Sequence, residues 1–316
     1  MDIEHIHPEL REAFKRMPTL PLHNRLVVAC LKALMKVIPV PQAGPGVAIE
    51  NRRSESASVR IYRPEGVLSG AGLLWIHGGG LVIGRPEQDD RRCAAMAREL
   101  KLIVVSARYR LAPQNTHPAA INDCFEAWQW LQRSARDLGI DPERVAISGQ
   151  SAGGGLAACL AQRILDTGGV QPAAQMLFGP MLDDRTALRH DLDAIKYPLW
   201  TNRNNRAGWS WYLGQPAGVT AVASYASASR RENLQQLPAA WLSVGDIELF
   251  YDEVCRYAER LEAAGVPCQL HVVPKAPHGF ESIVPDAPLS QEMMRSAYRF
   301  LDKWLALSHD SLAAAE

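Results

Sequence analysis

A glycine–serine–glycine motif is the first group of residues in this sequence that could do chemistry. Its serine is Ser151, which lies between a strand-like run at residues 144–148 and a helix-like run at residues 154–167. In that context a strained turn lifts a serine hydroxyl off the end of a sheet, where it can act as a nucleophile. The alternative is an ordinary strand-to-helix turn with a serine near the helix cap. We take Ser151 as the candidate nucleophile.

A second motif, one histidine followed by three glycines at residues 77–80, comes directly after a strand-like run. A tetrahedral oxyanion needs backbone N–H donors, and glycines let the backbone approach it closely. We expect the N–H groups of Gly78, Gly79 and Ala152 to form an oxyanion hole. The alternatives are a flexible turn or a phosphate loop, and no lysine follows at the spacing that a phosphate loop requires.

The candidate general base is His278, in a loop after the last strand-like run, residues 269–273. A single histidine is more often a satisfied loop or core residue. Of the nine histidines, however, only His278 both follows the candidate acids and has a glycine beside it. It therefore completes the chain order serine, acid, histidine.

Two carboxylates compete for the role of the acid, Asp246 and Glu248, at the end of the run 240–244. The acid must orient the imidazole and stabilise the imidazolium. Either residue could do this, and the unused one would stabilise the start of the next helix.

Strand-like and helix-like runs alternate along the chain, which predicts βαβ crossovers and a mostly parallel sheet flanked by helices, an α/β fold. The expected strands are residues 59–62, 73–76, 102–106, 144–148, 174–178, 240–244 and 269–273. The expected helices are residues 88–100, 119–138, 154–167, 251–264 and 289–307, with further helix in 8–38.

Taken together, these motifs resemble the hormone-sensitive-lipase-like family of carboxylesterases over about residues 57–305. The matching segments are residues 77–80, 109–113, 149–154, 245–253 and 278–280. The resemblance implies an α/β-hydrolase sheet with a helical cap, hydrolysis of short-chain acyl esters, and no metal or organic cofactor. Alignment with the family favours Glu248 over Asp246 as the acid. Gln150 and Gln114 stand where the family often has acidic residues.

The expected organisation is an N-terminal helical cap segment, residues 1–46, followed by a catalytic domain, residues 47–316. An insertion at about residues 183–228 is rich in tryptophan and lacks a clear strand. It would complete the cap, and Trp200, Trp209 and Phe280 are the candidate substrate-binding residues. The apolar run 26–38 indicates an amphipathic helix packed on the protein body, with a membrane-surface helix as the alternative.

Composition limits the partners. Lysine plus arginine and aspartate plus glutamate both number 34, so no net charge attracts nucleic acid or an anionic membrane. The six cysteines form no Cys-x-x-Cys pair and suggest buried apolar residues, with no disulfide or metal site. The polar start and the lack of a long apolar run predict a cytoplasmic protein without a membrane span. A small neutral ester is the expected partner, and a homodimer remains open.

Two other functions fit the same motifs. A small-molecule receptor on this fold would keep the pocket and lose the base. The presence of Ser151, Glu248 and His278 therefore disfavours a receptor. An amide deacetylase would use the same nucleophile and base. The sequence therefore favours a serine carboxylesterase with these two alternatives.

Overall fold

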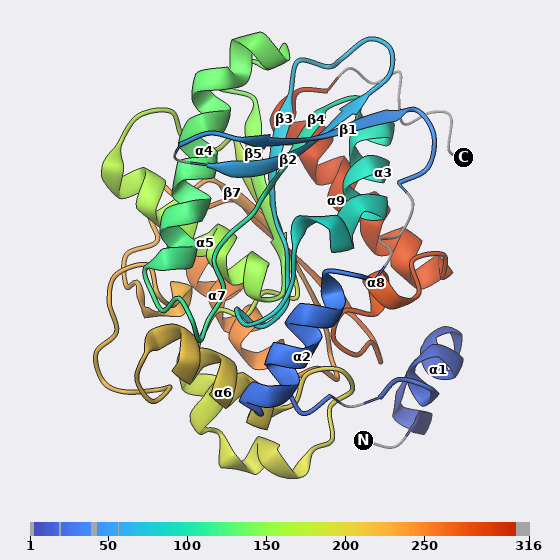
Figure 1. Cartoon of the computed structure of the whole chain (residues 1–316), viewed down its shortest axis with the longest axis vertical. Coiled ribbons are helices and arrows are strands. Elements are labelled where there is room, and N and C mark those ends of the chain that lie inside the picture. Colours follow the sequence, from blue (N-terminus) through green and yellow to red (C-terminus); the bar gives the residue numbers. More distant parts are fainter. Residues whose placement is uncertain (1–2, 19, 39–42, 56, 308–316) are drawn as a thin grey trace.

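The computed structural model describes residues 3–18, 20–38, 43–55 and 57–307, which fold around an eight-stranded sheet (Figure 1). Along the sheet the strands lie in the order β1-β2-β4-β3-β5-β6-β7-β8. Only β2 pairs antiparallel with its neighbours, and the pairs from β4 through β8 are parallel. The strands are β1 Val47–Arg53, β2 Ser58–Pro64, β3 Gly72–Ile76, β4 Ile103–Ala107, β5 Val145–Gln150, β6 Ala174–Phe178, β7 Ala239–Gly245 and β8 Cys268–Val273.

Helices cover both faces of the sheet, because successive side chains of a strand point to opposite faces and both sets are apolar here. On β3, Leu74 and Ile76 join a cluster with α4, α5 and α7, whereas Leu73 and Trp75 join a second cluster with α3 and α9. The helices are α1 Pro8–Lys15, α2 Arg25–Met35, α3 Asp90–Leu100, α4 Ala119–Leu138, α5 Ala152–Thr167, α6 Asn202–Leu213, α7 Tyr251–Ala263, α8 Phe280–Ile283 and α9 Pro288–Leu305. Short 3-10 turns lie at η1 Ile3–His5, η2 Pro86–Asp89, η3 Asp184–Leu188, η4 His190–Ala194 and η5 Ala228–Arg230.

The prediction of a mostly parallel α/β sheet is confirmed, and α4 and β6 have the predicted bounds. Strand β1 was not expected. Its residues are mostly exposed and include Glu50, Arg52 and Arg53, so it lacks the apolar pattern that marks the other strands. Its pairing with β2 places it at the edge of the sheet, where polar side chains are tolerated.

The N-terminal helices and the insertion meet outside the sheet, where α2 and α6 lie side by side (Figure 1). The Asn204 side chain on α6 accepts a hydrogen bond from the backbone N–H of His23 at 3.1 Å and donates one to the carbonyl of Leu20 at 3.0 Å. The Arg25 guanidinium lies 5.7 Å from the ring centre of Trp211. Residues 183–228 contain α6 and 3-10 turns and no strand, as the sequence indicates.

Helix α2 packs less closely than its apolar sequence predicts. Val28 is its one buried residue, while Leu26 is 76% exposed and Val37, just beyond its end, is 75% exposed. The helix does pack on the protein body, as expected, through a row that includes Val28 and Leu31. Its other apolar residues, such as Leu26, remain largely exposed.

The cysteines also differ from the prediction. All six have free thiols, but only Cys93, Cys124 and Cys159 are buried, and Cys30 on α2 is exposed. Its exposure follows from the open face of α2, since it lies one turn after Leu26. Within the described ranges, no helix is long and apolar enough to cross a bilayer.

Candidate active site

Ser151 occupies the turn between β5 and α5 with φ of +55° and ψ of −121°, a conformation that strains a residue with a side chain. The turn is possible because glycines on either side of Ser151 let neighbouring backbone segments approach closely. A Cβ atom on Gly153 would lie 2.1 Å from the carbonyl oxygen of Ile76, and one on Gly149 would lie 2.3 Å from the carbonyl oxygen of Gly153. The Ser151 hydroxyl is thereby fixed at the carboxyl end of the central strands.

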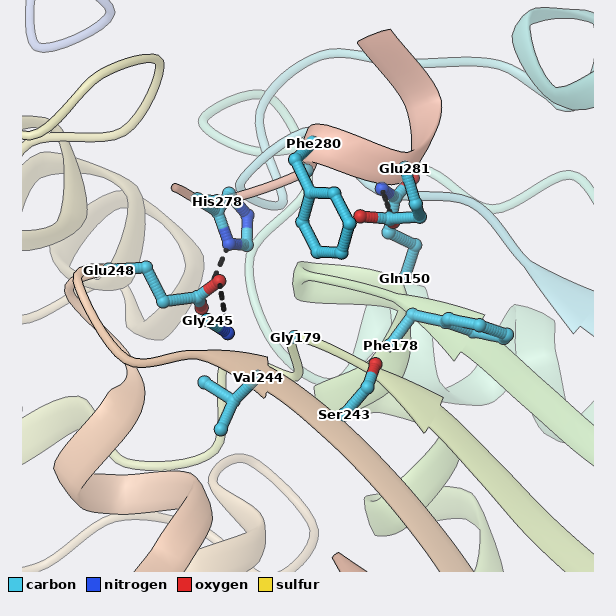
Figure 2. Close-up of a pocket in the computed structure, with 11 residues that line it drawn as sticks. Gln150, Phe178, Gly179, Ser243, Val244, Gly245, Glu248, His278, Phe280 and Glu281 are labelled. Carbon is cyan, nitrogen blue, oxygen red and sulfur yellow. Dashed lines mark hydrogen bonds and ion pairs between the residues drawn. The ribbon is translucent and has the colours of Figure 1, made fainter. Parts of the chain in front are cut away.

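His278 connects this hydroxyl to a carboxylate. Its Nε2 lies 2.8 Å from Ser151 Oγ, and its Nδ1 lies 3.1 Å from Glu248 Oε1. Figure 2 shows the Glu248 carboxylate between the His278 ring and the backbone of Gly245. All three side chains are buried. The geometry brings the three residues selected from the sequence into one hydrogen-bonded row.

The competing acid, Asp246, points elsewhere. It is exposed, and its Oδ1 accepts a hydrogen bond from the backbone N–H of Lys275 at 2.6 Å. It therefore ties the β7–α7 turn to the segment that leads to His278. Glu248 is the carboxylate that faces the imidazole.

The environment of His278 favours its protonated form. Burial alone would lower the pKa of His278, but the charge and hydrogen bond of Glu248, with a smaller effect of Glu281, raise it above its ordinary value. A Glu248 carboxylate that accepts from Nδ1–H leaves Nε2 free to accept the Ser151 proton. The ring also packs edge-on against Phe250, with centroids 5.1 Å apart.

The glycine run lies beside the nucleophile and is held by aromatic contacts. The ring of His77 stacks on Tyr109 with centroids 4.2 Å apart, and the Tyr109 hydroxyl donates to the His77 carbonyl at 2.8 Å. Burial lowers the pKa of His77 to about 4, so its ring is neutral near pH 7. No hydrogen bond found among the described residues uses the backbone N–H of Gly78, Gly79 or Ala152, which leaves these donors available.

The candidate substrate-binding residues occupy different places. Trp200 packs on the glycine run, because a Cβ on Gly80 would lie 2.0 Å from its Cη2. Phe280 lies beside His278 (Figure 2). Trp209 instead packs edge-on to Tyr212 inside the insertion, with centroids 6.1 Å apart.

Leu199 and Gly179 are site residues that sequence reasoning missed. Leu199 has φ of +65°, and its Cδ2 lies 3.2 Å from the position of a Cβ on Gly279, next to His278. A Cβ on Gly179 would make a tight contact, 3.3 Å from the His278 ring, and the φ of +45° also favours glycine there. A lone leucine or glycine carries no sequence signal for such a contact.

A small pocket borders the His278–Glu248 pair (Figure 2). Its lining comes from the ends of β5, β6 and β7 and from the start of α8: Gln150, Phe178, Gly179, Ser243, Val244, Gly245, Glu248, His278, Gly279, Phe280 and Glu281. Over the ranges described, no group of three or more histidine, cysteine, aspartate or glutamate side chains is placed to hold a metal ion.

Gln114, one of the two departures from the family pattern, lies outside this pocket. Its Oε1 accepts a hydrogen bond from Lys32 Nζ at 2.6 Å, and the same ammonium donates to the carbonyl of Ala112 at 2.8 Å. Burial lowers the pKa of Lys32. Gln114 therefore helps to fasten α2 to the loop that supports His77.

A serine presented on a strained strand-to-helix turn of a mostly parallel sheet, within reach of a histidine from a later loop, defines an α/β-hydrolase. The chain belongs to the family described as alpha/beta hydrolase fold, whose model matches residues 73–282. Within that superfamily it is a member of the hormone-sensitive-lipase-like group, as its motifs indicate.

Curated relatives and solved structures agree with this assignment. Esterase LipI of Mycobacterium tuberculosis is 33% identical over 289 residues, which are 90% of this chain and 84% of that protein. Ethyl acetate hydrolase of Pseudomonas putida is 32% identical over 76% of each chain. The structure of a bacterial heroin esterase has a TM-score of 0.86, 34% identity, and covers 96% of this chain and 99% of its own. The chain is a carboxylic ester hydrolase.

Proposed function

We propose that the chain hydrolyses short-chain acyl esters through Ser151, His278 and Glu248. The 2.8 Å contact between Ser151 Oγ and His278 Nε2, at the strained turn, carries this proposal. Such a distance suits proton transfer from the hydroxyl to the imidazole. The neighbouring Glu248 stabilises the imidazolium that forms, which its effect on the His278 pKa supports.

In this mechanism Ser151 Oγ attacks the ester carbonyl as His278 takes its proton, and a tetrahedral oxyanion forms. The N–H groups of Gly78, Gly79 and Ala152 bind the oxyanion. His278 then protonates the departing alcohol, which leaves an acyl-enzyme on Ser151. A water molecule, deprotonated by His278, attacks the acyl group and restores the hydroxyl.

Preference for short acyl groups is supported by how the insertion packs. Trp200 fills space beside Gly80 of the glycine run, and Leu199 fills space beside Gly279, the residue after His278. A similar protein from Pseudomonas putida acts on ethyl acetate, an ester with a two-carbon acyl group. We propose that residues 183–228, together with the N-terminal helices, form the cap that limits acyl length.

The test is a burst of p-nitrophenol from p-nitrophenyl acetate, with the acyl group located by peptide mass spectrometry. One equivalent should appear rapidly, with the acetyl group on Ser151. Ser151→Ala should lose on the order of 10⁶ in kcat at an unchanged Tm, whereas more than about a tenth of wild-type activity would contradict the assignment. Absence of both a burst and steady turnover would favour a receptor, and faster turnover of p-nitroacetanilide would favour a deacetylase.

A further inference from the structure

Gln150, the residue before the nucleophile, makes side-chain contacts that point away from Ser151. Its Nε2 donates to Glu281 Oε1 at 2.6 Å and to Ser282 Oγ at 2.7 Å. Figure 2 shows the Gln150 and Glu281 side chains meeting next to Phe280. Gln150 and Glu281 are 8% and 6% exposed, so water competes little for this bond.

The two partners of Gln150 lie on α8, three and four residues after His278. This helix spans only Phe280–Ile283, and its N-cap residue, Gly279, has no side chain that could cap it. Such a short helix has little stability of its own. The position of the His278 loop therefore depends on what holds α8 from outside.

Charged groups from other elements lie around the Gln150–Glu281 bond and around His278. Arg92 on α3 lies 3.3 Å from Glu281 Oε1 and donates to Ser282 Oγ at 2.7 Å. Asp89 on η2 accepts from Trp75 Nε1 at 2.7 Å, and burial raises its pKa to about 6. Glu248 faces His278 from the β7–α7 turn. Among the described residues, Glu281 forms a salt bridge with Arg92 and accepts a hydrogen bond from the neutral amide of Gln150.

We propose that Gln150 is a positioning residue that holds the His278 loop at its working distance from Ser151 through Glu281. The proposal rests on the proposed function. Three hydrogen bonds between described residues then join the nucleophile turn to the segment 278–282: the reacting contact, Ser151 to His278, and the two bonds of Gln150, to Glu281 and Ser282. The bond from Gln150 to Glu281 is called the brace below. The brace needs an amide on one side, because a carboxylate on both sides would repel.

Exchanging the two side chains tests this pairing. Gln150→Glu keeps the shape of the side chain but places two carboxylates together. Glu281→Gln keeps the shape and removes the charge. The double variant, Gln150→Glu with Glu281→Gln, restores one amide and one carboxylate in reversed positions. Gln150→Leu serves as a control that removes the brace without adding charge.

Activity, Tm and a pH profile are measured for each protein with p-nitrophenyl acetate. Gln150→Glu and Gln150→Leu should lose about 10² in kcat with KM changed little, because a displacement of the general base by about 1 Å has this effect. The double variant should recover most of the loss made by Gln150→Glu. Since Glu281 helps to raise the pKa of His278, Glu281→Gln should move the acid limb of kcat/KM to lower pH.

A residue that only fills space would give another pattern. Wild-type kcat in Gln150→Glu and Gln150→Leu would overturn the proposal, as would a loss that tracks Tm and is not recovered in the double variant. If Gln150→Glu does not fold, the acid limb of Glu281→Gln and the kcat of the double variant decide. Absence of esterase activity in the wild-type protein would instead refute the proposed function. Failure of the positioning proposal and failure of the proposed function can therefore be distinguished.

Discussion

The turn at Ser151 and helix α2 both lie in apolar stretches of the sequence, but they contact the rest of the protein in different ways. Around Ser151 the backbone approaches so closely that even a Cβ on Gly153 would fall 2.1 Å from a carbonyl oxygen. On α2, by contrast, Leu26 is three-quarters exposed, and contacts from Lys32 and the Asn204 region fasten this part of the chain. The candidate nucleophile is therefore fixed by main-chain packing, whereas the outer segments are attached by a few side chains. Changes in the first region should alter rate, and changes in the second should alter substrate choice or little at all.

After the loss of the nucleophile itself, the largest effect is expected at the acid. Glu248→Gln should keep the fold but misdirect the imidazole tautomer, with a loss of up to about 10⁴ in kcat. Asp246→Asn, the matched control two residues away, should lose about tenfold at most, through the turn that it supports. Comparison of kcat and Tm for both variants decides. An inactive Asp246→Asn beside an active Glu248→Gln would reverse the assignment.

A pH profile examines the same fixed region without a mutation. His278 must be neutral to accept the Ser151 proton, and its pKa is raised above the ordinary value of about 6.5. The value of kcat/KM should therefore fall as pH decreases through the raised pKa of His278. Below that pKa it should fall about tenfold per pH unit. Glu248→Gln should shift this limb to lower pH. A flat profile between pH 5 and 8 would argue against a histidine base.

Acyl-length selectivity examines the outer segments. Trp200→Ala should open space beside Gly80 and so favour longer acyl groups. The ratio of kcat/KM for p-nitrophenyl octanoate to that for p-nitrophenyl acetate should rise by about tenfold, since one methylene is worth about 10–200-fold in a fitted pocket. Trp209→Ala is the matched control, because Trp209 packs inside the insertion against Tyr212. It should lower Tm and leave that ratio unchanged. A wild-type optimum at twelve carbons or more would refute the short-chain proposal.

The smallest effect is expected on the open face of α2. Leu26→Ser and Val37→Ser should change the free energy of unfolding by less than about 0.5 kcal/mol, as exposed positions do. Val28→Ala, the buried counterpart on the same helix, should cost about 2 kcal/mol. Urea denaturation measures both. Equal losses would mean that the exposed face is covered in solution.

The sequence was most informative where periodicity or a motif reports packing directly. The short strand β6 is a buried, mostly apolar run, and the long helix α4 repeats its buried residues at helical spacing, so their bounds could be predicted. Strand β1 could not, because an edge strand with Glu50 and Arg52 has no apolar face. The exposure of α2 could not be predicted either, since hydrophobicity does not say whether a partner surface exists.

The candidate site shows the same division. The serine, histidine and glycine motifs identified residues that the structure brings together, but Asp246 and Glu248 could be separated only by alignment. The bond from Gln150 to Glu281 joins residues 131 positions apart, and neither lies in a pattern that names the other. Leu199, with φ of +65°, contacts the Gly279 position across 80 positions of the chain, and no sequence pattern marks this pair.

The contact between Trp200 and Gly80 has a consequence for recombining this protein with its relatives. The indole occupies the volume that any side chain at residue 80 would need, with a Cβ position only 2.0 Å from Cη2. The insertion and the glycine run are therefore sterically coupled, although 120 positions separate Gly80 and Trp200 in the chain. A chimaera that receives the insertion 183–228 must keep glycine at residue 80. One that receives a bulkier loop there must also receive a smaller residue at 200.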